Sequence, residues 1–191
     1  MESFRDAEVP DLIGPGLRLL FVGINPGLWT AATGAHFARP GNRFFPALEA
    51  AGIIERPIDP TSGLSTADRD YLIARGVGIT NLVARATARA DELTTEELVD
   101  GAGRLHETVR ALSPSVVAVA GITAYRTGFG VKSAKVGRQP ADLEGAELWV
   151  VPNPSGLNAH ETVATLARTY RRAADAAGIV GHPHRSCNSE R

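Results

Sequence analysis

The chain has 191 residues, of which 43% are apolar and 21% are charged, and its formal net charge is −1. This length suits one well-buried core, and the near-neutral charge excludes a surface that is basic all over, so any nucleic-acid-binding surface must be local. We therefore expect a single domain over residues 1–191, with its core at about 16–177 and loose tails at 1–15 and 179–191.

In chain order, the first predicted element is a short apolar run, Leu17 to Val22, which indicates a buried strand. A helical pattern follows from about Asn42, and Pro46 has to lie in its first turn or kink it. Three further apolar runs without alternation predict strands that are covered on both faces. They span residues 76–83, 115–121 and 147–152.

Two longer helical patterns lie among these strands. One begins with a capping box formed by Thr94 and Glu97, and it ends before Pro114. The other spans residues 161–178 and closes on a glycine. Alternating strands and helices predict an α/β fold in which helices cover both faces of a mainly parallel sheet.

Two loops stand out because each follows a predicted strand and carries Asn-Pro with a glycine close behind. They are residues 23–45, which show no helical or strand period, and residues 153–160. In mainly parallel sheets, ligands bind where the loops leave the carboxyl ends of the strands. We therefore expect these two loops to form the functional site.

Several common types of site are absent from the sequence. It has no Walker A loop, no dinucleotide-binding G-x-G-x-x-G after the first strand and no G-x-S-x-G elbow. The one cysteine, Cys187, excludes an internal disulfide framework, and together with His182 and His184 it is expected to be solvated rather than to bind a metal. We expect no metal and no cofactor.

Targeting and membrane signals are also missing. The N-terminal residues lack the basic and apolar regions of a signal peptide, and no apolar run reaches the roughly 18 residues of a membrane span. These observations predict a cytoplasmic protein with no membrane partner.

The first loop offers an amide at the end of a strand. Asn25 would lie just past the strand, Pro26 would restrict its backbone, and Gly27 would let another molecule approach closely. An amide oxygen can accept a hydrogen bond from water and aim it. Phe37 could stack on a flat ring. Alternatively, Asn25 stabilises a turn and Phe37 belongs to the core.

The second loop offers a place for DNA. Ser155 and the backbone N–H groups near Gly156 precede a helix that starts near His160, which is a suitable position for a phosphate. Leu157 is an apolar side chain in a polar loop. It either folds back onto the core or acts as a wedge in an opened base stack.

The segments "GINPG", "TGAHFARPGNRFF" and "NPSGLN" together resemble the mismatch-specific uracil-DNA glycosylase and thymine-DNA glycosylase branch of the uracil-DNA glycosylase superfamily. The resemblance runs from about Gly16 to Ala177. It implies a three-layer α/β/α sandwich that flips uracil, and possible further substrates such as thymine or ethenocytosine, out of double-stranded DNA with G·U or similar mismatches. Hydrolysis of the N-glycosidic bond then leaves an abasic site. It further implies a monofunctional enzyme, taken here as a monomer.

The resemblance also assigns roles to individual residues. Asn25 matches the residue that positions water, and Asn153 stands where related branches carry a second catalytic side chain, a histidine. The residues expected to bind the flipped base are Ile24, Gly27, Thr30 and Phe37. The residues expected to fill the gap in the duplex or contact DNA are Pro154, Ser155, Gly156, Leu157, Asn158 and His160. One departure is Ala159, where the bacterial relatives carry arginine, so either the opened duplex is held less firmly or His160 substitutes.

The expected mechanism starts from a mismatch, where flipping a base costs least. Backbone N–H groups would stabilise the negative charge that grows on the departing base. Phosphate contacts are expected from local basic residues, namely Arg39, Arg43, Lys132, Lys135 and Arg138. Two alternatives stay open: a nucleoside or nucleotide N-glycosidic hydrolase, and a DNA-lesion-binding protein without catalytic activity.

Overall fold

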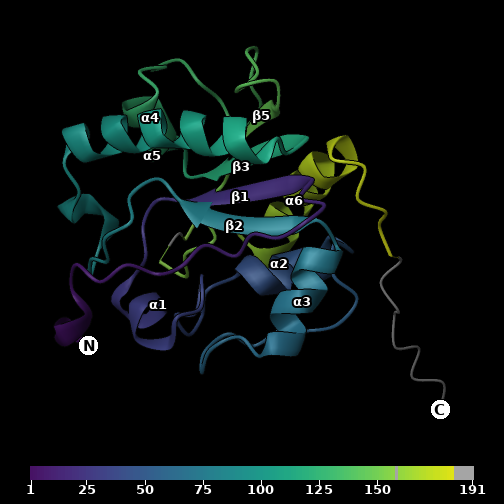
Figure 1. The fold of residues 1–191 in the computed structure, drawn as a ribbon, viewed down its shortest axis with the longest axis horizontal. Coiled ribbons are helices and arrows are strands. Elements are labelled where there is room, and N and C mark those ends of the chain that lie inside the picture. The colour runs from purple at the N-terminus through teal and green to yellow at the C-terminus, as the bar shows by residue number, and fades with distance from the viewer. Residues whose placement is uncertain (158, 183–191) are drawn as a thin grey trace.

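The structure is a computed structural model that describes residues 1–157 and 159–182. A five-stranded sheet with the strand order β2-β1-β3-β5-β4 lies at its centre (Figure 1). The strands are β1 (Leu19–Gly23), β2 (Val77–Asn81), β3 (Val116–Ala120), β4 (Gly137–Arg138) and β5 (Glu147–Val151). Strands β2, β1, β3 and β5 are parallel, and only β4 runs antiparallel to its neighbour β5. The prediction of a mainly parallel sheet is confirmed.

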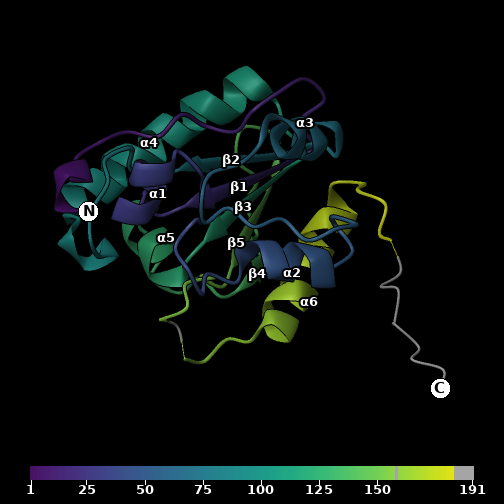
Figure 2. The same cartoon turned by 90° about the horizontal axis from the view of Figure 1, so that it is seen from below.

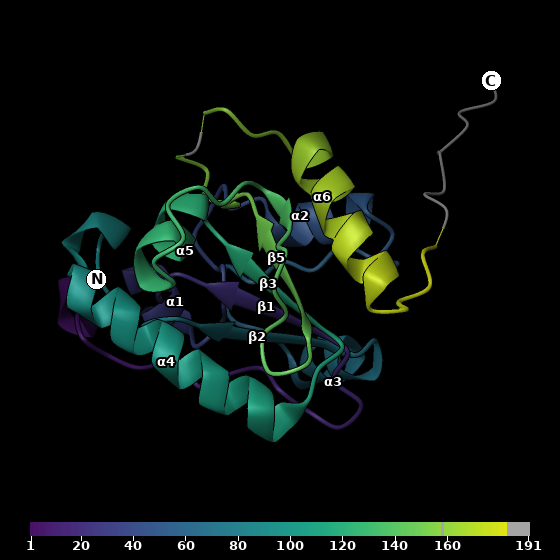
Figure 3. The same ribbon diagram turned by 90° about the horizontal axis from the view of Figure 1, so that it is seen from above.

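Helices cover both faces of this sheet, which confirms the α/β/α architecture (Figure 1). The helices are α1 (Leu28–Thr33), α2 (Phe44–Ala50), α3 (Thr66–Ala74), α4 (Thr95–Leu112), α5 (Ile122–Gly128) and α6 (Val163–Ala176), with short 3-10 turns at Glu2–Phe4 and Ala90–Glu92. Figure 2 shows α2 beside α6 on one face, where Phe44 and Tyr170 are buried together. Figure 3 shows α4 and α5 over the other face, where Val109 and Tyr125 are buried.

The predicted start of α4 is confirmed, and α2 and α6 begin at Phe44 and Val163, slightly later than predicted. Pro46 lies in the first turn of α2, where its missing N–H costs nothing. Thr94 and Glu97 form the expected capping box at the start of α4. The last helix, α6, begins after Thr162, whose hydroxyl accepts a hydrogen bond from the backbone N–H of Thr165.

Three short helices and one short strand differ from the expectation. The loop predicted over residues 23–45 contains α1, and the helices α3 and α5 were not expected at all. Each of the three has between six and nine residues, and α1 and α5 lack a side-chain N-cap, so their sequence signal is weak. The strand β4 has only two residues.

Within the described residues, segments near both termini are held by the fold, although loose tails were expected there. Leu12 is fully buried, and its backbone exchanges two hydrogen bonds with that of Ile79 in β2 (2.9 and 2.8 Å). At the other end Ile179 is buried, and the backbone N–H of His182 donates to the Gly52 carbonyl (3.0 Å). The expectation of loose tails is therefore wrong for these segments, because strand pairing and apolar burial hold them. The residues after His182, including His184 and Cys187, lie outside the described residues.

In the described part of the chain, no helix is both long enough and apolar enough to span a bilayer.

Candidate active site

The carboxyl ends of the parallel strands surround a cavity of about 570 Å³. This volume lies in the range of small-molecule sites, about 300–1,000 Å³. Its wall includes the loop after β1, the last residues of β2 and β3, and the loop after β5. Of the residues predicted from sequence, those that line it are Ile24, Asn25, Gly27, Thr30, Phe37, Arg39, Asn153, Ser155 and Leu157. The two Asn-Pro loops, about 130 residues apart in the chain, meet at this cavity.

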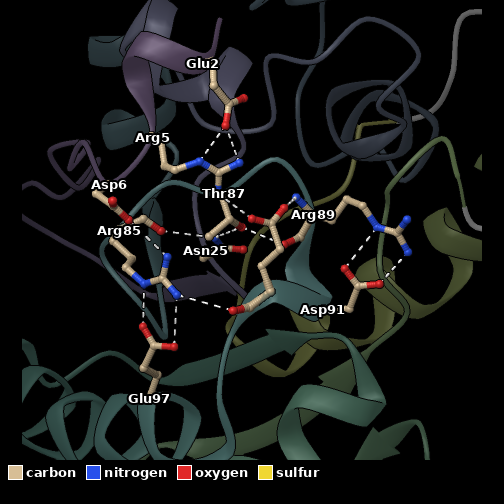
Figure 4. Close-up of polar contacts among 10 residues, drawn as sticks. Glu2, Arg5, Asp6, Asn25, Arg85, Thr87, Arg89, Asp91 and Glu97 are labelled. Atoms are coloured by element: carbon tan, nitrogen blue, oxygen red, sulfur yellow. Dashed lines mark hydrogen bonds and ion pairs between the residues drawn. The ribbon is translucent and has the colours of Figure 1, made fainter.

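The amide of Asn25 is fixed in one orientation. Its Nδ2 donates to the backbone carbonyl of Arg85 (3.1 Å) and to Oγ1 of Thr87 (2.7 Å) (Figure 4). The Thr87 hydroxyl donates its own proton to the Arg89 carbonyl (2.7 Å), so it can only accept from Asn25. Both partners therefore require Nδ2 on this side, which leaves Oδ1 as the acceptor that Asn25 brings to the cavity.

Phe37 offers an aromatic face to the same cavity. One face of its ring stacks on Phe44, with centroids 4.0 Å apart and planes 22° from parallel. The ring is half-buried and lines the cavity, and its backbone is left-handed with φ of +57°. A non-glycine residue held in this conformation is uncommon outside sites that constrain it. The fixed ring gives a flat ligand a stacking surface.

A second amide, Asn81 at the end of β2, is oriented by a buried histidine. Nε2 of His36 lies 3.1 Å from the Pro10 carbonyl, which can only accept, so the proton is on Nε2. Nδ1 of His36 is then the acceptor for Nδ2 of Asn81 (3.3 Å). Burial lowers the pKa of His36, which agrees with the neutral ring. Asn81 therefore brings one remaining amide proton and Oδ1 to the cavity.

Close packing beside Asn81 explains one glycine. A Cβ at Gly23 would lie 2.4 Å from Oδ1 of Asn81, which is closer than atoms can approach. Only glycine at the end of β1 leaves Asn81 in its place.

The second Asn-Pro loop uses its amide differently. Oδ1 of Asn153 accepts a hydrogen bond from the backbone N–H of Ser155 (3.0 Å), which closes a local turn. The Ser155 hydroxyl in turn accepts from the N–H of Leu157 (3.3 Å). Asn153 thus shapes its loop with its oxygen, whereas Asn25 is anchored through its nitrogen. Asn153 still lines the cavity, so its predicted catalytic role stays a prediction.

The two loops are fastened together by backbone contacts and by Arg43. The Arg43 N–H donates to the Pro154 carbonyl (3.0 Å), and its guanidinium donates to the carbonyls of Gly156 (3.2 Å) and Glu161 (2.7 Å). A Cβ at Gly156 would lie 2.7 Å from the Gly41 carbonyl. Arg43 was expected to contact phosphate. In the structure its guanidinium instead binds two backbone carbonyls and so joins the two loops.

The tip of the second loop is open to solvent. Leu157 is 72% exposed although it lines the mouth of the cavity, so the alternative that it folds back onto the core is wrong. An exposed leucine beside a pocket fits a wedge. Ala159 and His160 are exposed next to it, while Asn158 lies outside the described residues.

The other basic residues expected to contact phosphate differ in their location and in their ion pairs. Arg39 lines the cavity and is exposed. Lys132 and Lys135 are exposed in the loop between α5 and β4. Arg138 forms ion pairs with Asp142 and Glu147, so its charge is already matched.

The polar residues of this site that were not identified from the sequence include His36, Asn81 and Thr87. Asn81 carried a partial signal, because it lies near the end of the strand predicted over residues 76–83, and in the structure it is the last residue of β2. Thr87 and His36 carried none, since their partners are distant in the chain. Among residues 1–157 and 159–182, no group of three His, Cys, Asp or Glu side chains is placed to hold a metal ion.

Comparison with known proteins identifies the family. A solution NMR structure from Methanosarcina acetivorans, described as a candidate uracil DNA glycosylase, has a similar fold, with a TM-score of 0.55 and 15% sequence identity. The match covers 85% of this chain and 97% of the other. The family model described as the uracil DNA glycosylase superfamily matches residues 10–175, which is most of the chain. This chain therefore belongs to the uracil DNA glycosylase superfamily.

Proposed function

We propose that this chain is a monofunctional DNA glycosylase that flips uracil out of mismatched double-stranded DNA and hydrolyses its N-glycosidic bond. Membership of the superfamily supports a uracil glycosylase role. The observation that carries the finer proposal is the convergence of the oriented Asn25 amide and the exposed Leu157 at one cavity.

In this mechanism the flipped uracil stacks on the cavity face of Phe37. The edge of uracil presents an N–H donor between two carbonyl oxygens. The remaining amide proton and Oδ1 of Asn81 match one N–H and its neighbouring carbonyl. Cytosine presents the opposite pattern on that edge, an acceptor beside an amino donor, and would be rejected.

Bond cleavage depends on the leaving group and on a placed water. As the glycosidic bond lengthens, negative charge grows on uracil, and backbone N–H groups of the loop after β1 stabilise it in the confined cavity. Oδ1 of Asn25 accepts a hydrogen bond from water and holds it for attack on the sugar cation. The oxygen of that water bonds to C1′ of the sugar as the bond from C1′ to uracil breaks. It keeps one proton as the C1′ hydroxyl, and its other proton passes through solvent to the departing uracil anion, which leaves an abasic site.

On the DNA side, Leu157 enters the gap left by the flipped base, and the local cations Arg39, Lys132 and Lys135 contact phosphates. A G·U pair exposes its uracil more readily than a Watson–Crick pair, which supplies selectivity for the mismatch. We expect DNA affinity to fall steeply with salt.

The test is to incubate the protein with labelled duplexes that carry G·U, A·U, G·T or G·ethenocytosine, and with single-stranded uracil DNA and free deoxyuridine. Treatment with alkali then reveals abasic sites as strand breaks. The proposal predicts the fastest cleavage at G·U. Cleavage of deoxyuridine without action on duplexes would instead indicate a nucleoside hydrolase, and binding to G·U duplex without strand breaks would indicate a lesion-binding protein.

A further inference from the structure

We propose that the N-terminal strap, residues 1–8, positions the Asn25 amide through the bridge segment, residues 85–92. The inference rests on the proposed role of Asn25 in holding water. It assigns a function in catalysis to residues that lie outside the cavity.

The side of the bridge segment that faces the loop after β1 binds Asn25. The Arg85 carbonyl and the Thr87 hydroxyl accept the two Asn25 hydrogen bonds described above, and the Thr87 N–H donates to the Pro26 carbonyl (3.1 Å). Thr87 is buried and pairs with Gly27 in a parallel bridge. Any shift of the bridge segment would therefore move the Asn25 amide with it.

The strap forms backbone hydrogen bonds with the opposite side of the bridge segment. The Asp6 N–H donates to the Ala86 carbonyl (2.9 Å), and the Ala86 N–H donates to the Ala7 carbonyl (2.9 Å). Successive residues of an extended chain direct their backbone groups to opposite sides. Ala86 therefore binds the strap while its neighbours Arg85 and Thr87 bind the Asn25 loop.

Side chains connect the strap to the bridge segment at two further points (Figure 4). Oδ1 of Asp6 accepts from the Arg85 guanidinium (3.1 Å), which also binds Glu97 on α4. Arg5 binds the Glu92 carboxylate.

The second connection continues as a chain of hydrogen bonds to the site. The other oxygen of the Glu92 carboxylate accepts from the Arg89 N–H (2.8 Å), and the Arg89 carbonyl accepts from the Thr87 hydroxyl (2.7 Å). The Thr87 hydroxyl accepts from Asn25 (2.7 Å). An exposed arginine of the strap is thereby linked to the amide in the cavity by four consecutive contacts.

The expected effect is on geometry more than on folding. Asp6 and Arg5 are exposed, and exposed ion pairs each add little to stability. Small displacements of a catalytic group, in contrast, cost much of its rate. Loosening the strap should therefore slow bond cleavage while the fold and the DNA-binding surface stay intact.

The test compares the double variant Arg5→Ala/Asp6→Ala with wild type in single-turnover excision from G·U duplex at saturating enzyme. We expect the excision rate to fall about tenfold, in line with the loss of a partner that orients a site residue. Duplex affinity should change less than twofold. The control is Arg110→Ala, which breaks a surface ion pair with Glu144 and should leave both quantities unchanged.

Two further measurements distinguish a displaced Asn25 amide from a general loosening of the protein structure. Arg5→Lys/Asp6→Glu keeps the charges and should recover most of the rate. In the Asn25→Ala background, loss of the strap contacts should reduce the residual rate less than twofold, because the amide through which they act is gone. An equal loss with and without Asn25 would overturn the proposal, and so would a wild-type rate in the double variant. Failure of wild type to excise uracil would instead reject the proposed function.

Discussion

The two Asn-Pro loops at the cavity have the same dipeptide and different surroundings. In the loop after β1, Pro26 is buried and the Asn25 amide is anchored through Nδ2 to residues 85–87. In the loop after β5, Asn153 uses Oδ1 to close its own turn, and the tip at Leu157 is largely exposed. The Asn25 amide is thus held by a distant segment of the chain, whereas the Asn153 oxygen closes a turn within its own loop, which Arg43 joins to the first loop.

A shared Asn-Pro motif therefore does not imply a shared role. An amide anchored through its nitrogen presents an acceptor, which suits the positioning of water. An exposed loop tip can move into a duplex, where a rigid one could not adapt to opened DNA. Chemistry is thus proposed for the first loop and opening of the duplex for the second.

Removing the Asn25 amide should slow excision more than any other substitution considered below. Asn25→Ala should lower the single-turnover excision rate on G·U duplex by roughly two to three orders of magnitude, because water is no longer held. Asn153→Ala, its matched control, should lose only about tenfold, since it chiefly alters a loop. DNA affinity, measured by fluorescence anisotropy, should be similar in both variants. Equal losses of rate would remove the distinction between the loops.

A smaller effect is expected from the tip of the second loop. Leu157→Ala should lower base flipping, reported by the fluorescence of 2-aminopurine beside uracil, and should slow excision about tenfold, in proportion to the lost apolar contact. Val131→Ala, at another exposed apolar side chain, should change neither signal. Normal flipping by Leu157→Ala would exclude the wedge.

Two glycine substitutions sharpen the contrast further. Gly156→Ala places a Cβ 2.7 Å from the Gly41 carbonyl, so the loop must shift, and we expect a loss of about 1–2 kcal/mol of unfolding free energy. Gly27→Ala meets nothing within 4 Å and should leave the unfolding free energy unchanged while slowing excision severalfold, because it narrows the cavity. Urea unfolding and single-turnover assays distinguish the two; a destabilised Gly27→Ala would contradict the description of the first loop.

The smallest effect concerns pH and the support of the bridge segment. The hydrogen bond from Arg85 is the main cause that lowers the pKa of Glu97 from 4.5 to about 2. Because the folded pKa is depressed, the stabilisation is present above about pH 4.5 and is lost as the pH falls toward 2. In urea unfolding, the stability difference between wild type and Glu97→Gln should therefore shrink as the pH is lowered from 5 to 3. A constant difference would show that the ion pair does not act in this way.

Much of the fold could be predicted because its strongest signals are local. The four parallel strands are mostly apolar, and α4 and α6 are long, amphipathic and capped by threonine. The short α1 and the two-residue β4 have too few residues to show a helical or strand pattern of apolar residues. Their stability therefore depends on tertiary packing. The pairing of residues 6–7 with Ala86 has no local signature either.

The site was predictable where residues follow strand ends and unpredictable where distant segments meet. Asn25, Phe37 and Leu157 line the cavity and lie in loops that could be located because each follows a predicted strand. Thr87 contributes through a hydrogen bond across 62 residues of sequence, which no spacing rule anticipates. The same holds for Arg43, whose guanidinium joins segments 113 residues apart.

In the proposed function, a uracil leaves the duplex and enters the cavity between Phe37 and Asn25. The most direct test is a crystal structure of the Asn25→Ala variant bound to a G·U duplex, because this variant should bind without cleaving. We expect uracil to stack on Phe37 with its edge on Asn81, and Leu157 to occupy the vacated space in the double helix. Uracil retained in the base stack, or DNA bound on another face of the protein, would contradict it.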